Sequence, residues 1–210
     1  MSKELQKNYS IGEEIGHGRF GVVFRCHSLD SGEVYAVKSV DKSLLADPVD
    51  LDGAEREAKI GQIAAAGNPH VVQIHSAYED EVSIHLVMDL CEGGDLFDRI
   101  AAGGGAPMRE EEAAELMQAL MEAVALCHRR GVAHRDLKPD NIMFDGKGRL
   151  LLADFGSAEC FGDGRAMRGI VGTPYYVAPE VAARGFRIGG MLWGREGDEG
   201  NRWDAVLRSA

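Results

Sequence analysis

The chain has 210 residues, of which 45% are hydrophobic and 27% are charged, and its formal net charge is -11. This size and composition suit a globular protein with one core or two small lobes, and the acidic balance argues against a nucleic-acid-binding surface. The four cysteines lie far apart without a CxxC pair, which argues against a disulfide framework or a zinc site and is typical of the cytosol.

At the N-terminus, residues 1–10 contain no apolar segment of the kind found in a secretory signal. No apolar run in the chain reaches the ~18 residues that a membrane span needs. We therefore expect a cytoplasmic protein without a membrane partner.

The first part of the chain has the pattern of β-strands. Segments rich in Val, Ile, Tyr and Phe predict three strands, over residues 9–16, 21–28 and 33–40. Residues 30–32, Asp-Ser-Gly, predict the turn between the last two strands. A helix is expected over about residues 52–66, and two further strands over residues 71–79 and 83–90.

The pattern becomes helical after residue 91. A short helix is expected within residues 93–100, and a long helix over residues 109–131. Apolar residues recur in the long segment at helical spacing, namely Ala113, Leu116, Met117, Leu120, Met121 and Val124. Glutamates in its first turn and arginines in its last turn match the helix dipole, and Gly131 predicts the residue just beyond its C-terminal cap.

Three glycines, Gly16, Gly18 and Gly21, form a G-x-G-x-x-G pattern. A dinucleotide-binding fingerprint requires a helix directly after these glycines, whereas Val22 to Phe24 predict a strand. A glycine-rich hairpin would let backbone N–H groups approach phosphates without obstruction by Cβ atoms. An ordinary flexible turn is the alternative, and the pattern alone favours that alternative.

Lys38 lies in the segment "YAVKSV", which is predicted to be a strand. A lysine in a strand is usually a solvated surface residue. Strand alternation would bury Ala36 and place Val37 and Lys38 on opposite faces. Lys38 becomes a candidate site residue only because the glycine pattern precedes it on the neighbouring strand.

The remaining motifs complete a known set. "HRDLKPDN" spans residues 134–141, "ADFG" spans 153–156 and "APE" spans 178–180. With the glycine pattern and "AVK", these motifs occur in the order found in protein kinases. From about residue 9 to residue 180 the chain therefore resembles the eukaryotic protein kinases.

The resemblance implies an α+β, bilobal protein-kinase-like fold. It implies a complete β-rich N-lobe over residues 1–91 and an incomplete helical C-lobe over residues 92–180. Residues 181–210 do not resemble a kinase, and we expect them to be disordered.

The resemblance also implies roles for the catalytic residues, with ATP and Mg²⁺ as cofactors. Asp136 would accept the proton of the substrate hydroxyl, and Lys138 would pair with the γ-phosphate. Asn141 and Asp154 would be the magnesium ligands. Thr173 would bridge Asp136 and Lys138.

Lys38 would hold the α- and β-phosphates, with an acidic partner on the following helix. Glu57 fits this partner best, and Glu55 is the alternative. Gly61, four residues after Glu57, occupies a position where a larger apolar residue is expected.

The nucleotide site implied by the resemblance also includes residues of the strands and of the segment that joins the lobes. These residues are Ile15, Gly16, Gly18, Gly21, Val23, Ala36, Met88, Asp89, Cys91 and Asp95. Ile15 and Val23 would sandwich the adenine, Met88 would be the gatekeeper, and Asp95 would lie near the ribose. A core-strand role for Val23 and a helix-start role for Asp95 remain nearly equal alternatives.

The sequences "DLKPDN" and "GTPYYVAPE" resemble serine/threonine kinases, and residues 85–100 resemble the calcium/calmodulin-dependent group of plants. Residues 154–164 and 168–181 are most similar to phosphoenolpyruvate carboxylase kinase, a small calcium-independent member, and the chain has no EF-hand loop. Asp95 and Asp140 occupy positions at which kinases that prefer basic substrates recognise a basic residue upstream of the target serine. The implied partner is a protein with a Ser or Thr near basic residues, with phosphoenolpyruvate carboxylase as the candidate.

The activation segment has an unusual composition. Between Ser157 and Thr173 the chain has no Ser, Thr or Tyr. Arginine before a catalytic aspartate requires an anionic partner, which phosphorylation often supplies. We expect Glu159 or Asp163 to supply this anion to Arg135, so activity should not depend on phosphorylation of the segment.

The C-terminal 30 residues contain repeated glycines and lack the D-x-W-S-x-G pattern that a kinase continues into. We favour truncation after the APE motif as the interpretation. Without further helices, the apolar residues of the helix at 110–130 would be exposed, so we expect a poorly folded second half with little activity. A catalytically inactive fragment that binds at most nucleotide or a partner is the alternative function, and a Rossmann oxidoreductase is a distant third.

Overall fold

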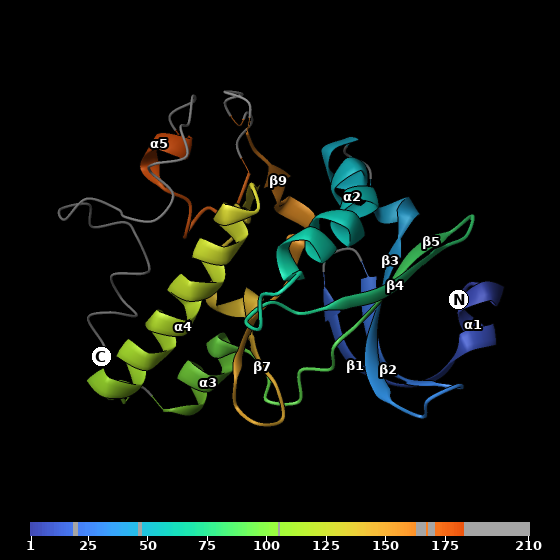
Figure 1. Cartoon of the computed structure of the whole chain (residues 1–210), viewed down its shortest axis with the longest axis horizontal. Helices are drawn as coiled ribbons and strands as arrows, with labels where there is room; N and C mark the ends of the chain where they lie inside the picture. The colour runs from blue at the N-terminus through green and yellow to red at the C-terminus, as the bar shows by residue number, and fades with distance from the viewer. Residues whose placement is uncertain (19–20, 46–47, 105, 163–166, 168–170, 183–210) are drawn as a thin grey trace.

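The computed structural model describes residues 1–182 except 19–20, 46–47, 105, 163–166 and 168–170. The predicted α+β fold is confirmed: a five-stranded antiparallel sheet forms the first half, and helices with two short strand pairs form the second (Figure 1). The expectation for the tail falls almost wholly on residues 183–210, which lie outside the described residues. Among the described residues, no helix is long and apolar enough to cross a membrane.

The sheet has the order β1-β2-β3-β5-β4. Its strands are β1 (Tyr9–Gly18), β2 (Gly21–Ser28), β3 (Val34–Asp41), β4 (Ile74–Glu79) and β5 (Ser83–Met88). In antiparallel pairs, directly opposed residues point to the same face. Val23 lies opposite Lys38, and Lys38 lies opposite Leu86, so these three side chains share one face of the sheet.

Helix α2 (Pro48–Ala65) packs on that face. The buried cluster between them includes Val40, Ala54 and Leu86. Figure 1 shows α2 beside the sheet and toward the helical half, so it can contact both halves of the molecule. A 3-10 turn, η1 (Lys42–Leu44), connects β3 toward this helix.

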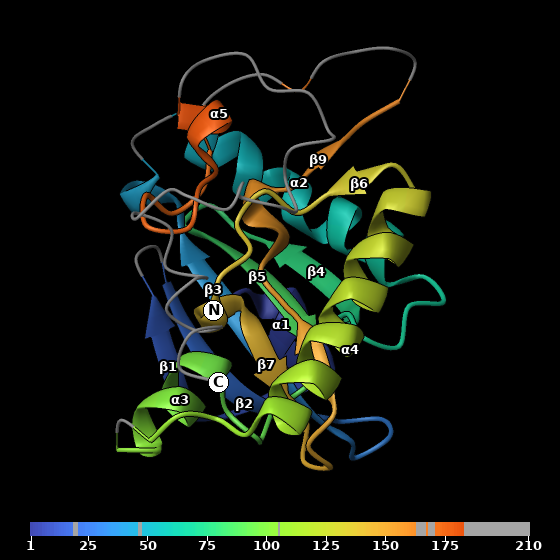
Figure 2. The same cartoon turned by 90° about the vertical axis from the view of Figure 1, so that its left-hand side faces the viewer.

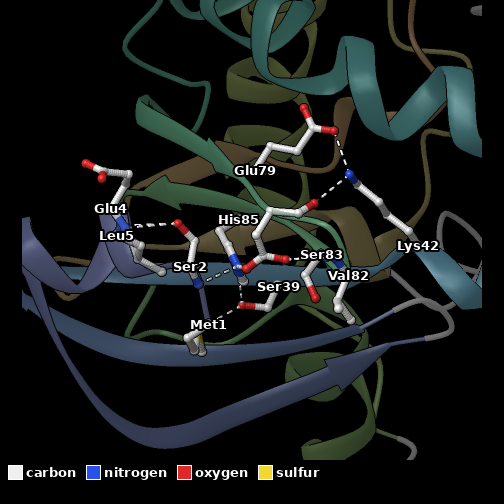
Figure 3. Close-up of polar contacts among 11 residues, drawn as sticks. Met1, Ser2, Glu4, Leu5, Ser39, Lys42, Glu79, Val82, Ser83 and His85 are labelled. Carbon is white, nitrogen blue, oxygen red and sulfur yellow. Dashed lines mark hydrogen bonds and ion pairs between the residues drawn. The ribbon is translucent and has the colours of Figure 1, made fainter.

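A short N-terminal helix, α1 (Lys3–Asn8), covers the opposite face of the sheet, and the sequence reasoning did not predict it. Leu5 is fully buried there against Val37 and Val87. The Ser2 hydroxyl accepts hydrogen bonds from the amides of the first turn and so caps the helix. Figure 3 shows the Ser2 amide pointing at His85, to whose Nε2 it donates at 3.2 Å, while Nδ1 of the same ring lies 2.8 Å from the Ser39 hydroxyl.

The second half is built around helix α4. Its elements are α3 (Leu96–Ala102), α4 (Glu110–Arg129), η2 (Pro139–Asn141), η3 (Phe155–Ser157) and α5 (Pro179–Ala182). Two short antiparallel strand pairs complete it, β6 (Val132–Ala133) with β9 (Glu159–Cys160) and, as a hairpin, β7 (Ile142–Phe144) with β8 (Leu150–Leu152). Figure 2 shows α4 running alongside β7, and β6 beginning near the end of α4. Gly131 has φ +70°, as predicted for the residue after the helix cap.

The expected exposure of the apolar face of α4 is wrong for two of its central residues. Leu120 and Val124 are only 2% and 3% exposed, because they pack in a cluster with Val71, Ile142 and Leu152 from both halves of the chain. The other three large side chains, Leu116, Met117 and Met121, are partly buried against the same cluster. The sequence argument failed here because it assigned this face to later helices alone and overlooked the loop before β4 and the two short strand pairs.

Candidate active site

Strand β3, helix α2 and the segment after β8 bring three charged residues together. Lys38 Nζ donates to both carboxylate oxygens of Glu57 at 2.8 and 2.9 Å, and to Asp154 Oδ1 at 3.0 Å. Glu57 is only 4% exposed, whereas Glu55 points to solvent. The structure therefore pairs Lys38 with Glu57 rather than with the alternative, Glu55.

The charges of this group influence one another. Burial acts to lower the pKa of Lys38, but the carboxylates of Glu57 and Asp154 outweigh it and raise the pKa above its usual value. The positive charge of Lys38 lowers the pKa of Asp154 to about 2, against the opposing effect of burial. Burial raises the pKa of Glu57, and Lys38 offsets part of that effect. Asp154 is therefore an ionised oxygen donor at neutral pH.

The loop at residues 134–141, called the catalytic loop below, holds Asp136 through several hydrogen bonds. Its Oδ1 accepts from both the amide and the hydroxyl of Thr173, each at 2.8 Å. Its Oδ2 lies 2.9 Å from Lys138 Nζ, and the Asn141 amide donates to its backbone carbonyl at 2.8 Å. Lys138 also donates to the Thr173 hydroxyl at 3.0 Å. A lysine, a threonine and an asparagine thus fix one carboxylate near the centre of the site.

The same loop is anchored to the Asp154 segment. The Ala153 amide donates to the Asn141 carbonyl at 2.9 Å, which places Asp154 next to Asn141. His134 is buried, with its Nε2 2.8 Å from the Ala153 carbonyl and its Nδ1 accepting from the Asp136 amide. The His134 ring contacts Phe155 edge-on at a centroid distance of 4.8 Å.

The chain matches the family described as "Protein kinase domain" over residues 9–189. It belongs to the protein kinase family. Three of the motifs, those that carry Lys38, Asp136 and Asp154, contribute residues to the contacts described above.

The kinase is similar to several plant proteins. It is 41% identical over 186 residues to calcium-dependent protein kinase 14 of Arabidopsis thaliana, covering 87% of this chain and 34% of the relative. It is 43% identical over 185 residues to calcium-dependent protein kinase 8 of Oryza sativa subsp. japonica, covering 87% of this chain and 34% of the relative. The kinase chain spans about a third of the length of these curated relatives.

Two residues of the kinase site have strained backbone conformations. Arg135 and Asp154 have φ values of +69° and +62°, and no other described non-glycine residue has a positive φ. Such conformations cost of order 1–3 kcal/mol each and persist where the surrounding contacts enforce them. One of these residues directly precedes Asp136, and the other is Asp154 itself.

The residues implied to hold magnesium fit that ion chemically. Asn141 offers an amide oxygen and Asp154 an ionised carboxylate, and Mg²⁺ prefers oxygen ligands. Among the described residues no group of three or more His, Cys, Asp and Glu side chains is arranged to hold a metal. Two protein ligands suit Mg²⁺, which commonly completes its coordination with water and substrate phosphates.

The glycines of the first hairpin differ in their surroundings. A Cβ added at Gly16 or Gly18 would meet no atom within 4 Å, so both face open space beside β1. A Cβ at Gly21 would lie 1.9 Å from the Ser39 carbonyl oxygen. Gly21 is therefore required for the close pairing of β2 with β3, a role that the nucleotide-binding interpretation did not include.

The other residues implied for the nucleotide line the adjoining surface. Ala36 is buried on the Lys38 face of the sheet, Val23 and Met88 are half-buried on the same face, and Ile15 is 42% exposed. This surface is apolar apart from Lys38, as expected of one that contacts a purine ring.

The segment that joins the two lobes, residues 89–91, is held to the sheet by Asp89. Its carboxylate accepts from the Gln73 amide at 3.1 Å and pairs with His75 at 2.7 Å. The Asp89 amide also donates to the Gln73 carbonyl at 3.1 Å, so both the backbone and the side chain of Asp89 bond to the segment at the start of β4. Burial raises the pKa of the Cys91 thiol to about 12, so this thiol stays protonated. The sequence reasoning missed His75, which no motif indicated.

Asp95 is the N-cap of α3. Its Oδ1 accepts from the Asp98 amide at 2.7 Å, which satisfies a free donor of the first turn. The structure thus gives Asp95 the helix-start role that the sequence left open, and Asp140 lies exposed on η2.

Arg135 forms an ion pair with Glu159 of β9. The guanidinium is 10% exposed and the carboxylate is 31% exposed. Glu159 was one of two expected anions, and the other, Asp163, lies outside the described residues. The ion pair connects the catalytic loop to the segment that follows Asp154.

Proposed function

We propose that the chain is a protein serine/threonine kinase that transfers the γ-phosphate of ATP to a protein hydroxyl. The observation that carries this proposal is the joint arrangement of Lys38, Glu57 and Asp154 on one side and of Asp136, Lys138 and Asn141 on the other. Phosphoryl transfer requires positioning and charge neutralisation rather than covalent chemistry from the protein. This constellation offers both.

In the proposed mechanism, Lys38 binds the α- and β-phosphates while Glu57 keeps its ammonium in place. Asn141 and Asp154 would hold Mg²⁺, which neutralises charge on the phosphates when it is bound. The Asp136 carboxylate orients the substrate hydroxyl and accepts its proton. Lys138 stabilises the negative charge that develops on the transferred group. Thr173 holds Lys138 and Asp136 in place through its hydrogen bonds to both side chains.

We further propose a substrate serine with basic residues upstream, and phosphoenolpyruvate carboxylase as the candidate protein. The acidic net charge, the exposed Asp140 and the similarity of residues 154–164 to phosphoenolpyruvate carboxylase kinase support this. The four free cysteines support the cytoplasm as the compartment, which cell fractionation would test.

The test is phosphate transfer by the whole chain to a basic serine peptide and to phosphoenolpyruvate carboxylase. Asp136→Asn should lower kcat by roughly 10²–10⁴-fold and leave ATP binding in place. ATP binding without any Asp136-dependent transfer would support the alternative of a nucleotide-binding but inactive protein. Transfer to the peptide but not to the carboxylase would retain the kinase and reject that substrate.

A further inference from the structure

Helix α2 carries two glycines that flank Glu57 at intervals of four residues, Gly53 and Gly61. Residues four apart lie on one side of a helix. The turn η3, directly after Asp154, packs against α2, and all three residues are buried. Glycine is unfavourable inside a helix relative to alanine, so the two positions call for an explanation in packing.

Gly53 lies against backbone. A Cβ added there would stand 2.5 Å from the Gly156 carbonyl oxygen, and ordinary contact begins at 3.4 Å. The carbonyl belongs to the main chain and cannot rotate away as a side chain can. Any side chain at residue 53 would therefore force α2 and η3 apart by roughly 1 Å.

Gly61 has a different neighbour. A Cβ there would lie 2.6 Å from the Ile74 δ-methyl group, the far end of a flexible side chain. The same methyl group fills the space that a larger residue at position 61 would take. A small rotation of Ile74 would accommodate an alanine, so Gly61 offers a matched control for Gly53.

The separation at Gly53 would affect charged residues of the site. A Cβ at Gly156 would lie 3.5 Å from both Glu57 Oε2 and Asp154 Oδ1, so the Gly156 backbone lies beside both carboxylates. Lys38 reaches both carboxylates at 3.0 Å or less. The distance between α2 and η3 therefore determines whether Lys38 can contact the carboxylates of Glu57 and Asp154 at the same time.

We propose that Gly53 is a positioning residue that lets α2 seat directly on the Gly156 backbone and thereby keeps Glu57 bonded to Lys38. The inference rests on the proposed kinase function for its effect on turnover, but not for its effect on the lysine. Gly53 touches no reacting atom and acts through Glu57.

The experiment compares Gly53→Ala with Gly61→Ala in the whole chain. Helix propensity alone predicts that both variants are as stable as the parent or more stable. The close approach predicts that Gly53→Ala lowers kcat by ~10–10²-fold, because small misplacements in a site have effects of this size. Gly61→Ala should stay within about twofold of the parent, since Ile74 can move. In a Glu57→Gln background, Gly53→Ala should lose most of its effect, because both changes disturb the same contact.

Amine labelling followed by mass spectrometry gives a measurement that does not need phosphate transfer. Lys38 should be labelled faster in Gly53→Ala than in Gly61→Ala, while Lys42, which pairs with Glu79, should be labelled equally in both. Equal labelling of Lys38 in the two variants would overturn the proposal, as would faster labelling of both lysines, which indicates general unfolding. If the parent transfers no phosphate, the proposed function fails while the labelling still decides the role of Gly53.

Discussion

At the scale of single residues, Thr173 contributes a hydroxyl that accepts from Lys138 and donates to Asp136. Thr173→Ala should lower kcat by roughly 10- to 100-fold, because a hydrogen bond to a charged group is lost on both sides. Thr173→Ser keeps the hydroxyl and should retain most of the activity. Steady-state kinetics with a serine peptide check this, and equal kcat values for the two variants would contradict the bridging role.

His134 makes the stability of the folded chain depend on pH. Burial lowers the pKa of His134, while the unfolded chain has a histidine pKa of about 6.5. Below that pH the unfolded chain binds a proton that the folded chain binds less readily. The contribution of His134 to stability is thus fully present above about pH 6.5 and decreases as the pH falls, by at most ~1.4 kcal/mol per pH unit.

We therefore expect the free energy of unfolding to fall less between about pH 7.5 and about pH 5.5 in His134→Gln than in the parent. Denaturant titrations at the two pH values measure this. Burial also lowers the pKa of His128, a ring that is only half-buried, so His128→Gln is a control with a smaller expected change. Identical pH dependence in His134→Gln and the parent would refute the expectation.

At the scale of secondary-structure elements, the pair between Arg135 and Glu159 connects the catalytic loop to β9. Glu159→Gln should lower kcat by roughly tenfold, equivalent to ~1.4 kcal/mol, because the mostly buried Arg135 side chain loses one charged partner. Phosphatase treatment of the parent should leave activity unchanged, since the carboxylate supplies the anion. Glu110→Gln, at the exposed start of α4, is the control for loss of one negative charge.

Loss of parental activity after phosphatase treatment, with a phosphosite mapped between residues 157 and 173, would contradict this account. So would a Glu159→Gln variant with parental kcat.

The elements also show where sequence reasoning succeeds and where it stops. Strand β2 spans the predicted residues 21–28, because residues of high strand propensity and the turn that follows them are visible in the sequence. Helix α1 was missed because six residues give too little periodicity, and the burial of Leu5 that stabilises it depends on the sheet. Helix α2 begins at Pro48, before the predicted residue 52, and proline at a helix start leaves no hydrophobic pattern.

At the scale of the whole molecule, the site draws on both halves of the chain, and this limits what a linear pattern can predict. The sequence motifs identified Lys38, Asp136 and Asp154 because each of these residues lies within a short motif of neighbouring residues. The choice between Glu55 and Glu57 depended on which face of α2 the sheet covers, and the role of Gly53 depends on how α2 seats on η3. Both are properties of tertiary packing that short motifs do not contain.

The acidic charge of the whole molecule leads to a prediction on substrate choice. The net charge is -11, and Asp140 is exposed beside the catalytic loop. Complementary charges increase encounter rates and favour one register of a bound peptide. A peptide with arginine upstream of its serine should therefore have a higher kcat/KM than its neutral counterpart, and added salt should reduce the difference because exposed charges are screened.

Asp140→Asn should lower kcat/KM for the basic peptide by roughly two- to fivefold, as expected of one exposed ion pair, and leave the neutral peptide unaffected. Asp30→Asn, in the exposed turn between β2 and β3, removes the same charge far from the catalytic loop and should change neither rate. Equal losses in Asp140→Asn and Asp30→Asn would indicate that only net charge matters. Equal rates on the two peptides at low salt would show that the kinase does not read basic residues, because neither the local carboxylate nor the overall field would then distinguish them.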